Sequence, residues 1–194
     1  MLSFENQAKE QGFSEIIGID EAGRGPLAGP VVASAVLLKK YQFNTVIRDS
    51  KKMTHKQRLC AYDEILEKGC VGIGMGDAKL IDRINILQAT FHAMTEAVKD
   101  LLTKISEKHV ERKNFISQTC LLIDGGLFQS SLPFAYKTII RGDSLSLSIA
   151  CASIIAKVTR DRMMEDYDKV YPQYGFAKHK GYPTVSHKGK IKEF

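Results

Sequence analysis

Residues 17–32 read IGIDEAGRGPLAGPVV, two short apolar runs separated by a turn rich in glycine and proline. The first apolar run predicts a strand over residues 15–20, and the second predicts a strand over residues 31–38. Because glycine and proline occupy turn positions in residues 23–30, we expect the two strands to pair as a hairpin. An Asp-Glu pair then stands where the first strand ends.

Downstream of the hairpin, the sequence predicts two helices with a strand between them. Thr54 is a suitable N-cap for a helix to residue 68, and Gly69 takes the C-terminal position that favours left-handed backbone. Residues 70–75 predict a strand. A longer helix starts at residue 81, because apolar residues recur at the spacing of one helical face. These residues are Ile84, Leu87, Phe91, Met94, Val98, Leu101 and Ile105.

The second half of the chain predicts two more strands, a helix and a surface arm. Apolar runs at 119–123 and 136–140 predict the strands, and residues 144–167, rich in Ala, Ile and Met, predict a long helix. Gly, Pro, Tyr and Lys dominate residues 171–189, which we expect to form an irregular surface arm. The mixture of strands and helices predicts an α/β fold around a mixed sheet.

Length and composition limit the class of protein. A chain of 194 residues suits one sizeable core, so we expect a single domain over residues 1–194. The formal net charge of +6 suits a polyanionic partner, although a solvated charged face explains it better when taken alone. No apolar run approaches the roughly 20 residues that cross a bilayer, and residues 1–10 lack a secretory signal. We therefore expect a cytoplasmic protein.

The cysteines are scattered and form no C-x-x-C pair. They are Cys60, Cys70, Cys120 and Cys151. Because all four lie within apolar segments, we expect reduced, buried thiols rather than a zinc site or a disulfide framework.

Acidic residues stand at the ends of three predicted strands. Asp20 and Glu21 close the first strand, and Asp124 and Asp143 come after two later ones. Side chains at strand ends converge at one edge of an α/β sheet, so these four are candidates for one site. Divalent cations stabilise grouped carboxylates, and hard oxygen ligands select Mg²⁺ or Mn²⁺ over zinc. For any one position, a turn former or a helix cap remains the simpler explanation.

The glycine-rich turn is itself a candidate binding element. Gly23 and Gly25 would let backbone amides approach a ligand closely, and Arg24 between them is a charged donor. No G-x-x-x-x-G-K-[ST] follows and no G-x-G-x-x-G opens a helix, which excludes a P-loop and a dinucleotide fingerprint. Composition alone does not separate a binding element from an ordinary hairpin turn.

A series of motifs runs along nearly the whole chain, with none in residues 99–118. They are residues 17–32, DSKK at 49–52, LIDG at 122–125, GDS at 142–144, ASIIAKVTRD at 152–161, YGF at 174–176 and HKGYPT at 179–184. In content and in order, these motifs resemble those of ribonuclease HII, the type 2 ribonuclease H.

The resemblance implies a ribonuclease H-like mixed sheet flanked by helices, with a C-terminal helical or irregular arm. The arm, from about residue 168 to 194, would be a substrate-binding extension. The catalytic carboxylates implied are Asp20, Glu21, Asp124 and Asp143, which would bind two divalent ions, Mg²⁺ or Mn²⁺. Family members hydrolyse the phosphodiester on the 5′ side of a ribonucleotide and leave 3′-hydroxyl and 5′-phosphate ends. The implied substrates are RNA/DNA hybrids and duplex DNA with embedded ribonucleotides, and the implied roles are ribonucleotide and RNA primer removal.

The resemblance also implies residues that bind substrate. They are Gly23, Arg24, Gly25, Ser50, Lys51, Ser153, Lys157 and Tyr182. The Gly-Arg-Gly element and Tyr182 match positions that read the 2′-hydroxyl, the group that distinguishes RNA from DNA locally. The serines and lysines match phosphate contacts, which fix register without reading bases. The ordinary alternatives are a surface aromatic for Tyr182 and a small packing residue for Ser153.

Two other functions compete with this interpretation. A ribonuclease HIII-like hybrid nuclease shares the carboxylates but lacks the Gly-Arg-Gly element. A non-catalytic nucleic-acid-binding module would have no reason to keep four carboxylates where they repel phosphates. We expect a monomer without membrane association, and the sequence does not reveal whether a replication clamp binds it.

Overall fold

A five-stranded sheet lies at the centre of the computed structural model, which describes residues 1–106 and 112–194. The strands are β1 (Glu15–Ala22), β2 (Val31–Leu38), β3 (Gly69–Gly76), β4 (Thr119–Asp124) and β5 (Ala135–Ile139). Their spatial order is β3-β2-β1-β4-β5. The pairs of β2 with β1 and β3 are antiparallel, whereas β4 pairs parallel with β1 and β5. The prediction of a mixed sheet is therefore confirmed.

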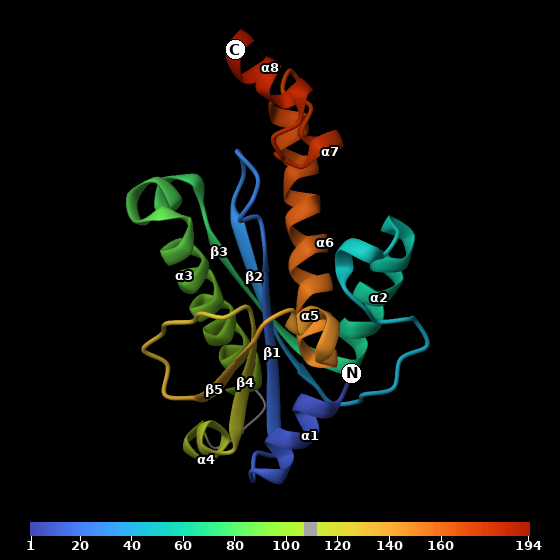
Figure 1. Ribbon diagram of the computed structural model, residues 1–194, viewed down its shortest axis with the longest axis vertical. Coiled ribbons are helices and arrows are strands. Elements are labelled where there is room, and N and C mark those ends of the chain that lie inside the picture. Colours follow the sequence, from blue (N-terminus) through green and yellow to red (C-terminus); the bar gives the residue numbers. More distant parts are fainter. Residues whose placement is uncertain (107–111) are drawn as a thin grey trace.

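Helices cover both faces of this sheet (Figure 1). They are α1 (Ser3–Glu10), α2 (His55–Lys68), α3 (Ala78–Ser106), α4 (Arg112–Ser117), α5 (Gly142–Leu145), α6 (Leu147–Val170), α7 (Phe176–His179) and α8 (Val185–Glu193), with a 3-10 turn, η1 (Ser50–Lys52). On one face lies α3, and α2 and α6 lie on the other (Figure 1). None of the described helices is both long and apolar enough to span a bilayer.

The predicted hairpin of β1 and β2 is present, and it divides the core between the two faces. Ile17 and Ile19 pack on the side of α3, while the intervening strand positions turn toward α6. This alternation is the period of two expected of a strand. Helix α6 approaches β1 so closely that a Cβ on Gly18 would lie 2.1 Å from the carbonyl carbon of Ser148. The sheet and α6 are thus closely packed and form a rigid support for the residues at the C-terminal end of β1.

Several predicted boundaries are wrong. Gly69 is extended, with φ −146°, and begins β3 instead of capping α2 in a left-handed conformation. The predicted helix over 144–167 is two helices, because Ser146 is extended and its hydroxyl accepts the Ile149 N–H as the N-cap of α6. The long helix α3 is also kinked, with Asn85 at φ 68°.

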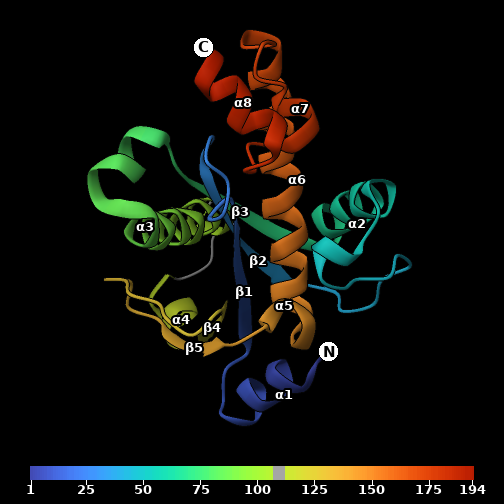
Figure 2. The ribbon, with the colours of Figure 1, turned by 45° about the horizontal axis from the view of Figure 1, so that its top comes forward.

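The two ends of the chain contain more helix than expected. At the N-terminus, α1 places Glu5 in the interior, where it accepts from the hydroxyl of Ser146 at 2.7 Å. The arm, for which composition predicted irregular structure and the family resemblance implied a helical or irregular extension, contains α7 and α8, which pack beyond the sheet at the far end of α6 (Figures 1 and 2). The expectation of buried cysteines holds for Cys120 and Cys151, but Cys60 is exposed and Cys70 is only partly buried.

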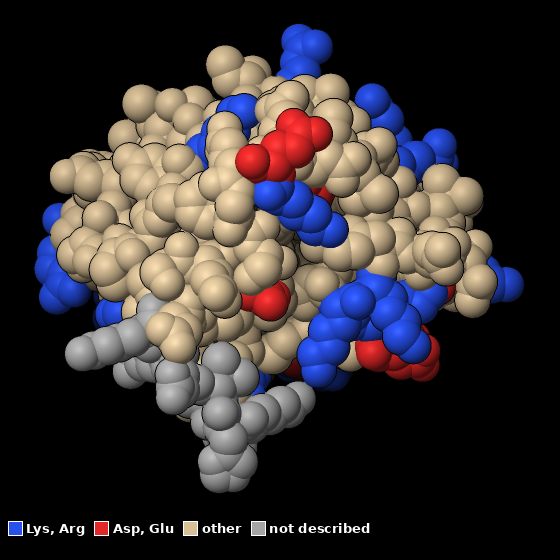
Figure 3. All heavy atoms as spheres, turned by 90° about the horizontal axis from the view of Figure 1, so that it is seen from below, with Lys and Arg blue, Asp and Glu red and all other residues tan. Residues whose placement is uncertain are grey.

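Charge is unevenly displayed on the molecular surface. The end that carries α1 and α4 shows mostly uncharged residues, with groups of Lys and Arg and a few Asp and Glu among them (Figure 3). Residues predicted to bind a polyanion lie elsewhere, on the side where β1, η1 and α6 meet the arm.

Candidate active site

The sheet brings two of the predicted carboxylates together. Strands β1 and β4 run parallel with Ile19 opposite Ile123, so the next residues, Asp20 and Asp124, lie side by side. Asp20 is buried, and its Oδ1 accepts the Glu21 N–H at 2.7 Å. The strand is longer than predicted and continues to Ala22, so Asp20 and Glu21 lie inside β1 rather than at its end.

The fourth carboxylate, Asp143, reaches the same place through a tight turn after β5. Arg141 adopts the left-handed conformation, with φ 58° and ψ 38°, and the chain then enters α5. The N–H of Gly142 donates to Asp124 Oδ1 at 2.6 Å. This bond ties the start of α5, and with it Asp143, to the end of β4.

Burial and mutual repulsion raise the pKa values of these acids. Burial raises the pKa of Asp20 well above the ordinary value, and the charges of Glu21 and Asp124 raise it further. Burial also raises the pKa of Glu21, although the guanidinium of Arg24, 3.2 Å away, opposes that shift. For Asp143, burial and then the charge of Asp124 raise the pKa. The carboxylates are therefore close enough to destabilise one another's charge.

One lysine partly balances this negative charge. Burial lowers the pKa of Lys51, but the charges of Asp20, Asp143, Asp49 and Asp124 outweigh burial and raise it. Lys51 lies two positions after Asp49, and its backbone N–H donates to Asp49 Oδ1 at 2.9 Å. The ammonium thus lies in the field of the whole acidic cluster, where a cation is favoured.

The donor set of the cluster suits a hard divalent cation. Four carboxylates provide only oxygen ligands, and excess negative charge is what Mg²⁺ or Mn²⁺ would neutralise. As placed, no three His, Cys, Asp or Glu side chains in residues 1–106 and 112–194 form a group that could hold a metal. The carboxylates are neighbours, and binding an ion would require their side chains to turn toward a common point.

A cavity of about 160 Å³ opens beside the carboxylates. Its lining residues are Glu21, Ala22, Gly23, Arg24, Gly25, Ser50, Lys51, Ser153, Lys157 and Tyr182. All eight residues named from the sequence as substrate-binding are in this lining, and they come from the glycine-rich loop, η1, α6 and the arm. Their roles stay predictions, but the chain brings them to one place.

The two serines of the lining are linked to each other. Ser50 and Ser153 are buried, and their hydroxyl oxygens lie 2.9 Å apart. The Ser153 hydroxyl also bonds to Asp20, which opposes the rise in the pKa of that acid. These contacts join η1 and α6 directly to the carboxylate cluster.

The lysine and the tyrosine of the lining lie close together. Lys157 Nζ donates to Asp161 Oδ1 at 2.7 Å and lies 5.9 Å from the centre of the Tyr182 ring. A Cβ on Gly25 would lie 3.7 Å from the same ring, so this ring borders the Gly-Arg-Gly element. The sequence analysis did not identify Asp161 as a partner, although it is the last residue of the ASIIAKVTRD motif.

Histidines fix the backbone of Tyr182, a role that the sequence analysis did not assign. The Tyr182 N–H donates to the carbonyl of His179 at 2.9 Å, and His187 Nδ1 donates to the Tyr182 carbonyl at 2.9 Å. The two imidazole rings stack with centroids 4.3 Å apart, and His187 is fully buried. Spacing in the sequence gave no signal for this pair, because α7 and α8 were not predicted.

Comparisons with known proteins agree with this geometry. A family model described as Ribonuclease HII matches residues 17–193. The chain is 50% identical to a ribonuclease HII of Ruminiclostridium cellulolyticum, over 100% of the chain and 71% of that protein. It is also 50% identical to a ribonuclease HII of Geobacter sulfurreducens, over 97% of the chain and 81% of that protein.

Solved structures share the ribonuclease H-like fold. The ribonuclease HII in the PCNA:RNase HII complex from Archaeoglobus fulgidus superposes with a TM-score of 0.65 and 22% identity, over 92% of this chain and 87% of that one. Bst-RNase HIII in complex with Mn²⁺ gives a TM-score of 0.69 and 17% identity, over 96% of this chain and 72% of that one. At such identities the likeness establishes the fold, while the family model and the half-identical relatives establish more. The chain belongs to the ribonuclease HII family and is a ribonuclease H enzyme.

Proposed function

We propose that this ribonuclease H hydrolyses the RNA strand of RNA/DNA hybrids and cuts on the 5′ side of ribonucleotides embedded in duplex DNA. The products would be 3′-hydroxyl and 5′-phosphate ends, and the roles would be removal of ribonucleotides and RNA primers. We propose a monomer that acts in the cytoplasm, with the arm from about residue 168 as a substrate-binding extension of a single domain.

The observation that carries the proposal is the crowding of four carboxylates beside a basic, hydroxyl-lined cavity. Asp20, Glu21 and Asp143 all have raised pKa values, and the charge of Asp124 contributes to each rise. Such strongly perturbed acids are typical of catalytic sites. If these acids had only a structural role, we would expect basic partners that neutralise their charges.

Divalent ions, Mg²⁺ or Mn²⁺, fit this set of oxygen donors, and we assign Asp20, Glu21, Asp124 and Asp143 to hold two of them. The chemistry that two such ions supply is activation of the attacking water and stabilisation of the leaving 3′ oxygen. The Mn²⁺ in the solved Bst-RNase HIII complex supports the use of a divalent ion in this fold. No side chain of the chain needs to act as a nucleophile.

The chain's own groups would bind and orient the substrate strand. Lys51 carries a positive charge beside the acids and would meet the scissile phosphate. In the lining of the same cavity, the Tyr182 ring borders Gly25, and Arg24 is half exposed. A 2′-hydroxyl held between these groups could both donate and accept hydrogen bonds, which would distinguish ribose from deoxyribose.

The competing functions have less support. Membership of the ribonuclease HII family and the Gly-Arg-Gly element at the cavity disfavour a ribonuclease HIII-like enzyme. An enzyme family also disfavours a purely binding module. The relative from Archaeoglobus fulgidus is solved with PCNA, and we make no corresponding assignment for this chain.

Replacing one carboxylate tests the assignment. Asp20→Asn keeps the size of the side chain and removes its charge, so cutting of a duplex with one ribonucleotide should fall by about 10²–10³-fold or more, with binding retained. The matched control is Asp63→Asn, at an exposed position of α2, which should cut at the normal rate. Rates are measured with Mg²⁺, with Mn²⁺ and with a chelator. An Asp20→Asn enzyme with the normal rate would refute the assignment.

A further inference from the structure

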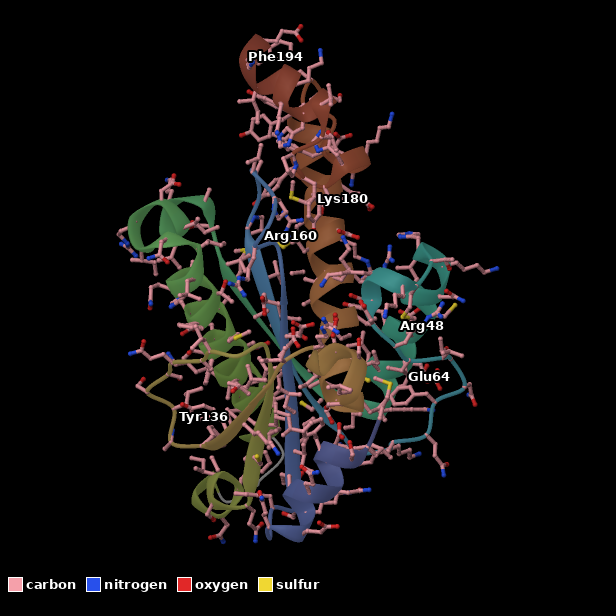
Figure 4. The ribbon with its side chains drawn as sticks, in the orientation of Figure 1. Arg48, Glu64, Tyr136, Arg160, Lys180 and Phe194 are labelled. Atoms are coloured by element: carbon pink, nitrogen blue, oxygen red, sulfur yellow. The ribbon has the colours of Figure 1, made fainter. Side chains whose placement is uncertain are left out.

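Arg160 is a buried cation that the reaction described above does not use. Its side chain is 1% exposed and belongs to the largest fully buried side chains of the described residues. It points from α6 toward the loop that joins β1 and β2, near the segment that carries Lys180 (Figure 4). Burial lowers the pKa of this guanidinium, so its environment does not favour the charge by itself.

The guanidinium donates to three backbone carbonyls on two separate segments. Nε donates to Pro30 at 2.9 Å and Nη2 donates to Ala28 at 3.0 Å, both in the glycine-rich loop. Nη1 donates to Lys180 at 2.9 Å, two residues before Tyr182. Because the guanidinium is a rigid plane, one side chain fixes the distance between the loop and the arm.

The same two segments also touch directly. The Leu27 N–H donates to the carbonyl of Gly181 at 2.9 Å. Gly181 has φ +83°, and a Cβ there would lie 2.2 Å from the carbonyl oxygen of Ala28. The loop and the arm therefore form one closely fitted unit around Arg160.

A buried charge is an expensive way to fill this space. Replacing buried ionic groups with apolar residues of similar volume is often neutral or stabilising, so stability alone does not explain an arginine here. Fixed hydrogen bonds define one relative position of two segments, which apolar packing does less strictly. Both segments line the proposed substrate cavity, the loop through Gly23, Arg24 and Gly25 and the arm through Tyr182.

We propose that Arg160 is a positioning residue for substrate selection, because it holds the glycine-rich loop and Tyr182 in the one register in which both reach the same ribonucleotide. The inference rests on the proposed function, in which these two segments read the 2′-hydroxyl. An embedded ribonucleotide offers a single 2′-hydroxyl, so both segments must meet it together. A long hybrid offers a ribonucleotide at every register, and its selection depends less on that alignment.

The test compares two substrates for two variants and a control. Arg160→Met removes all three donors at similar volume, and Arg160→Lys keeps one charged donor. The control is Arg162→Met, since Arg162 is exposed on α6 and lies over the Tyr62 ring. For Arg160→Met we expect kcat/KM on a single embedded ribonucleotide to fall about 10-fold more than on a long hybrid. Arg160→Lys should recover part of the difference, and Arg162→Met should leave the ratio unchanged.

Amide hydrogen exchange provides a readout that does not depend on catalysis. The Leu27 amide reports the contact between loop and arm, and the Ile19 amide reports the central strand. In Arg160→Met, we expect Leu27 to exchange about 10-fold faster while Ile19 keeps its protection. If the wild type cuts neither substrate, the proposed function fails and the Leu27 amide still tests the contact.

Three results would overturn the inference about Arg160. The first is an equal loss of activity on both substrates, and the second is unchanged exchange at Leu27. The third is loss of protection at Ile19 in both Arg160→Met and Arg160→Lys, which would make Arg160 an ordinary core residue.

Discussion

Removing the charge of Asp20 should stabilise the folded protein while it destroys activity. Asp20 is fully buried, its pKa is raised well above the ordinary value by burial, and the charges of Glu21 and Asp124 repel it. The Glu21 N–H and the Ser153 hydroxyl bond to the carboxylate and favour its charge. An Asn side chain keeps an oxygen that can accept these bonds, and it removes the repulsion and the buried charge.

The size of the effect follows from these opposing contributions. Losing charge assistance in two hydrogen bonds costs about 1 kcal/mol each, whereas burial and repulsion of an only partly compensated carboxylate are destabilising by several kcal/mol. We expect a net gain of about 1–2 kcal/mol in the free energy of unfolding for Asp20→Asn. For a chain of this length, that corresponds to a rise in Tm of about 2–8 °C.

The pH dependence has a definite sign. Because the folded-state pKa of Asp20 is raised, the native state binds more protons than the unfolded state between the ordinary carboxyl pKa and the raised value. The stability of the wild type should therefore fall as pH rises through that window, and the loss should persist at higher pH. Asp20→Asn should lack this contribution, so the difference between the two proteins should shrink at acid pH.

Thermal melting in metal-free buffer measures this prediction, with Asp63→Asn as the control for an exposed site. Adding Mg²⁺ should then raise the Tm of the wild type more than that of Asp20→Asn, because the ion binds the folded state and needs the carboxylate. The reasoning is refuted if Asp20→Asn melts at or below the wild type in a chelator at neutral pH.

Three further predictions follow from other contacts. Arg24→Ala should lower cutting of a single embedded ribonucleotide more than cutting of a long hybrid, and equal losses would contradict its role. Ser146→Ala removes the N-cap of α6 and a bond to Glu5, so unfolding in urea should show a loss of about 1–2 kcal/mol, and an unchanged midpoint would contradict that. His187→Leu removes the donor to the Tyr182 carbonyl, and His187→Asn can replace it. The Leu variant should cut embedded ribonucleotides about 10-fold more slowly than the Asn variant, and equal rates would argue against positioning of Tyr182 by His187.

The sequence predicted those parts of the fold that depend on local periodicity. The hairpin of β1 and β2, and the apolar face of α3, follow from patterns within a few residues. The break between α5 and α6 was missed, because Ser146 takes its extended conformation while its hydroxyl bonds to the distant Glu5. Likewise, Gly69 was predicted to cap a helix, but it pairs with Leu38 of β2 and is the first residue of β3.

For the site, motifs in the sequence identified the candidate residues, and only the fold shows which of them lie next to one another. Asp20 and Asp124 could be named from motifs, but no local pattern shows that parallel pairing of β1 and β4 sets them side by side. The Lys157–Asp161 pair, by contrast, lies at i,i+4 within α6, so helical spacing could have identified it. The histidine partners of Tyr182 are also near in sequence, and they were missed because α7 and α8 were not predicted. The hydrogen bond from Arg160 to Pro30 joins residues 130 positions apart, and only tertiary structure reveals contacts of that kind.

The central position of β1 has a consequence for the time at which the enzyme becomes active. Its hairpin with β2 needs only a short loop to close, whereas its pairing with β4 joins residues more than a hundred positions apart. Local pairings form early and distant ones late, so the acids should gather only near the end of folding. A chain still emerging from the ribosome would therefore not yet be able to cut an RNA/DNA hybrid, whatever divalent ions surround it.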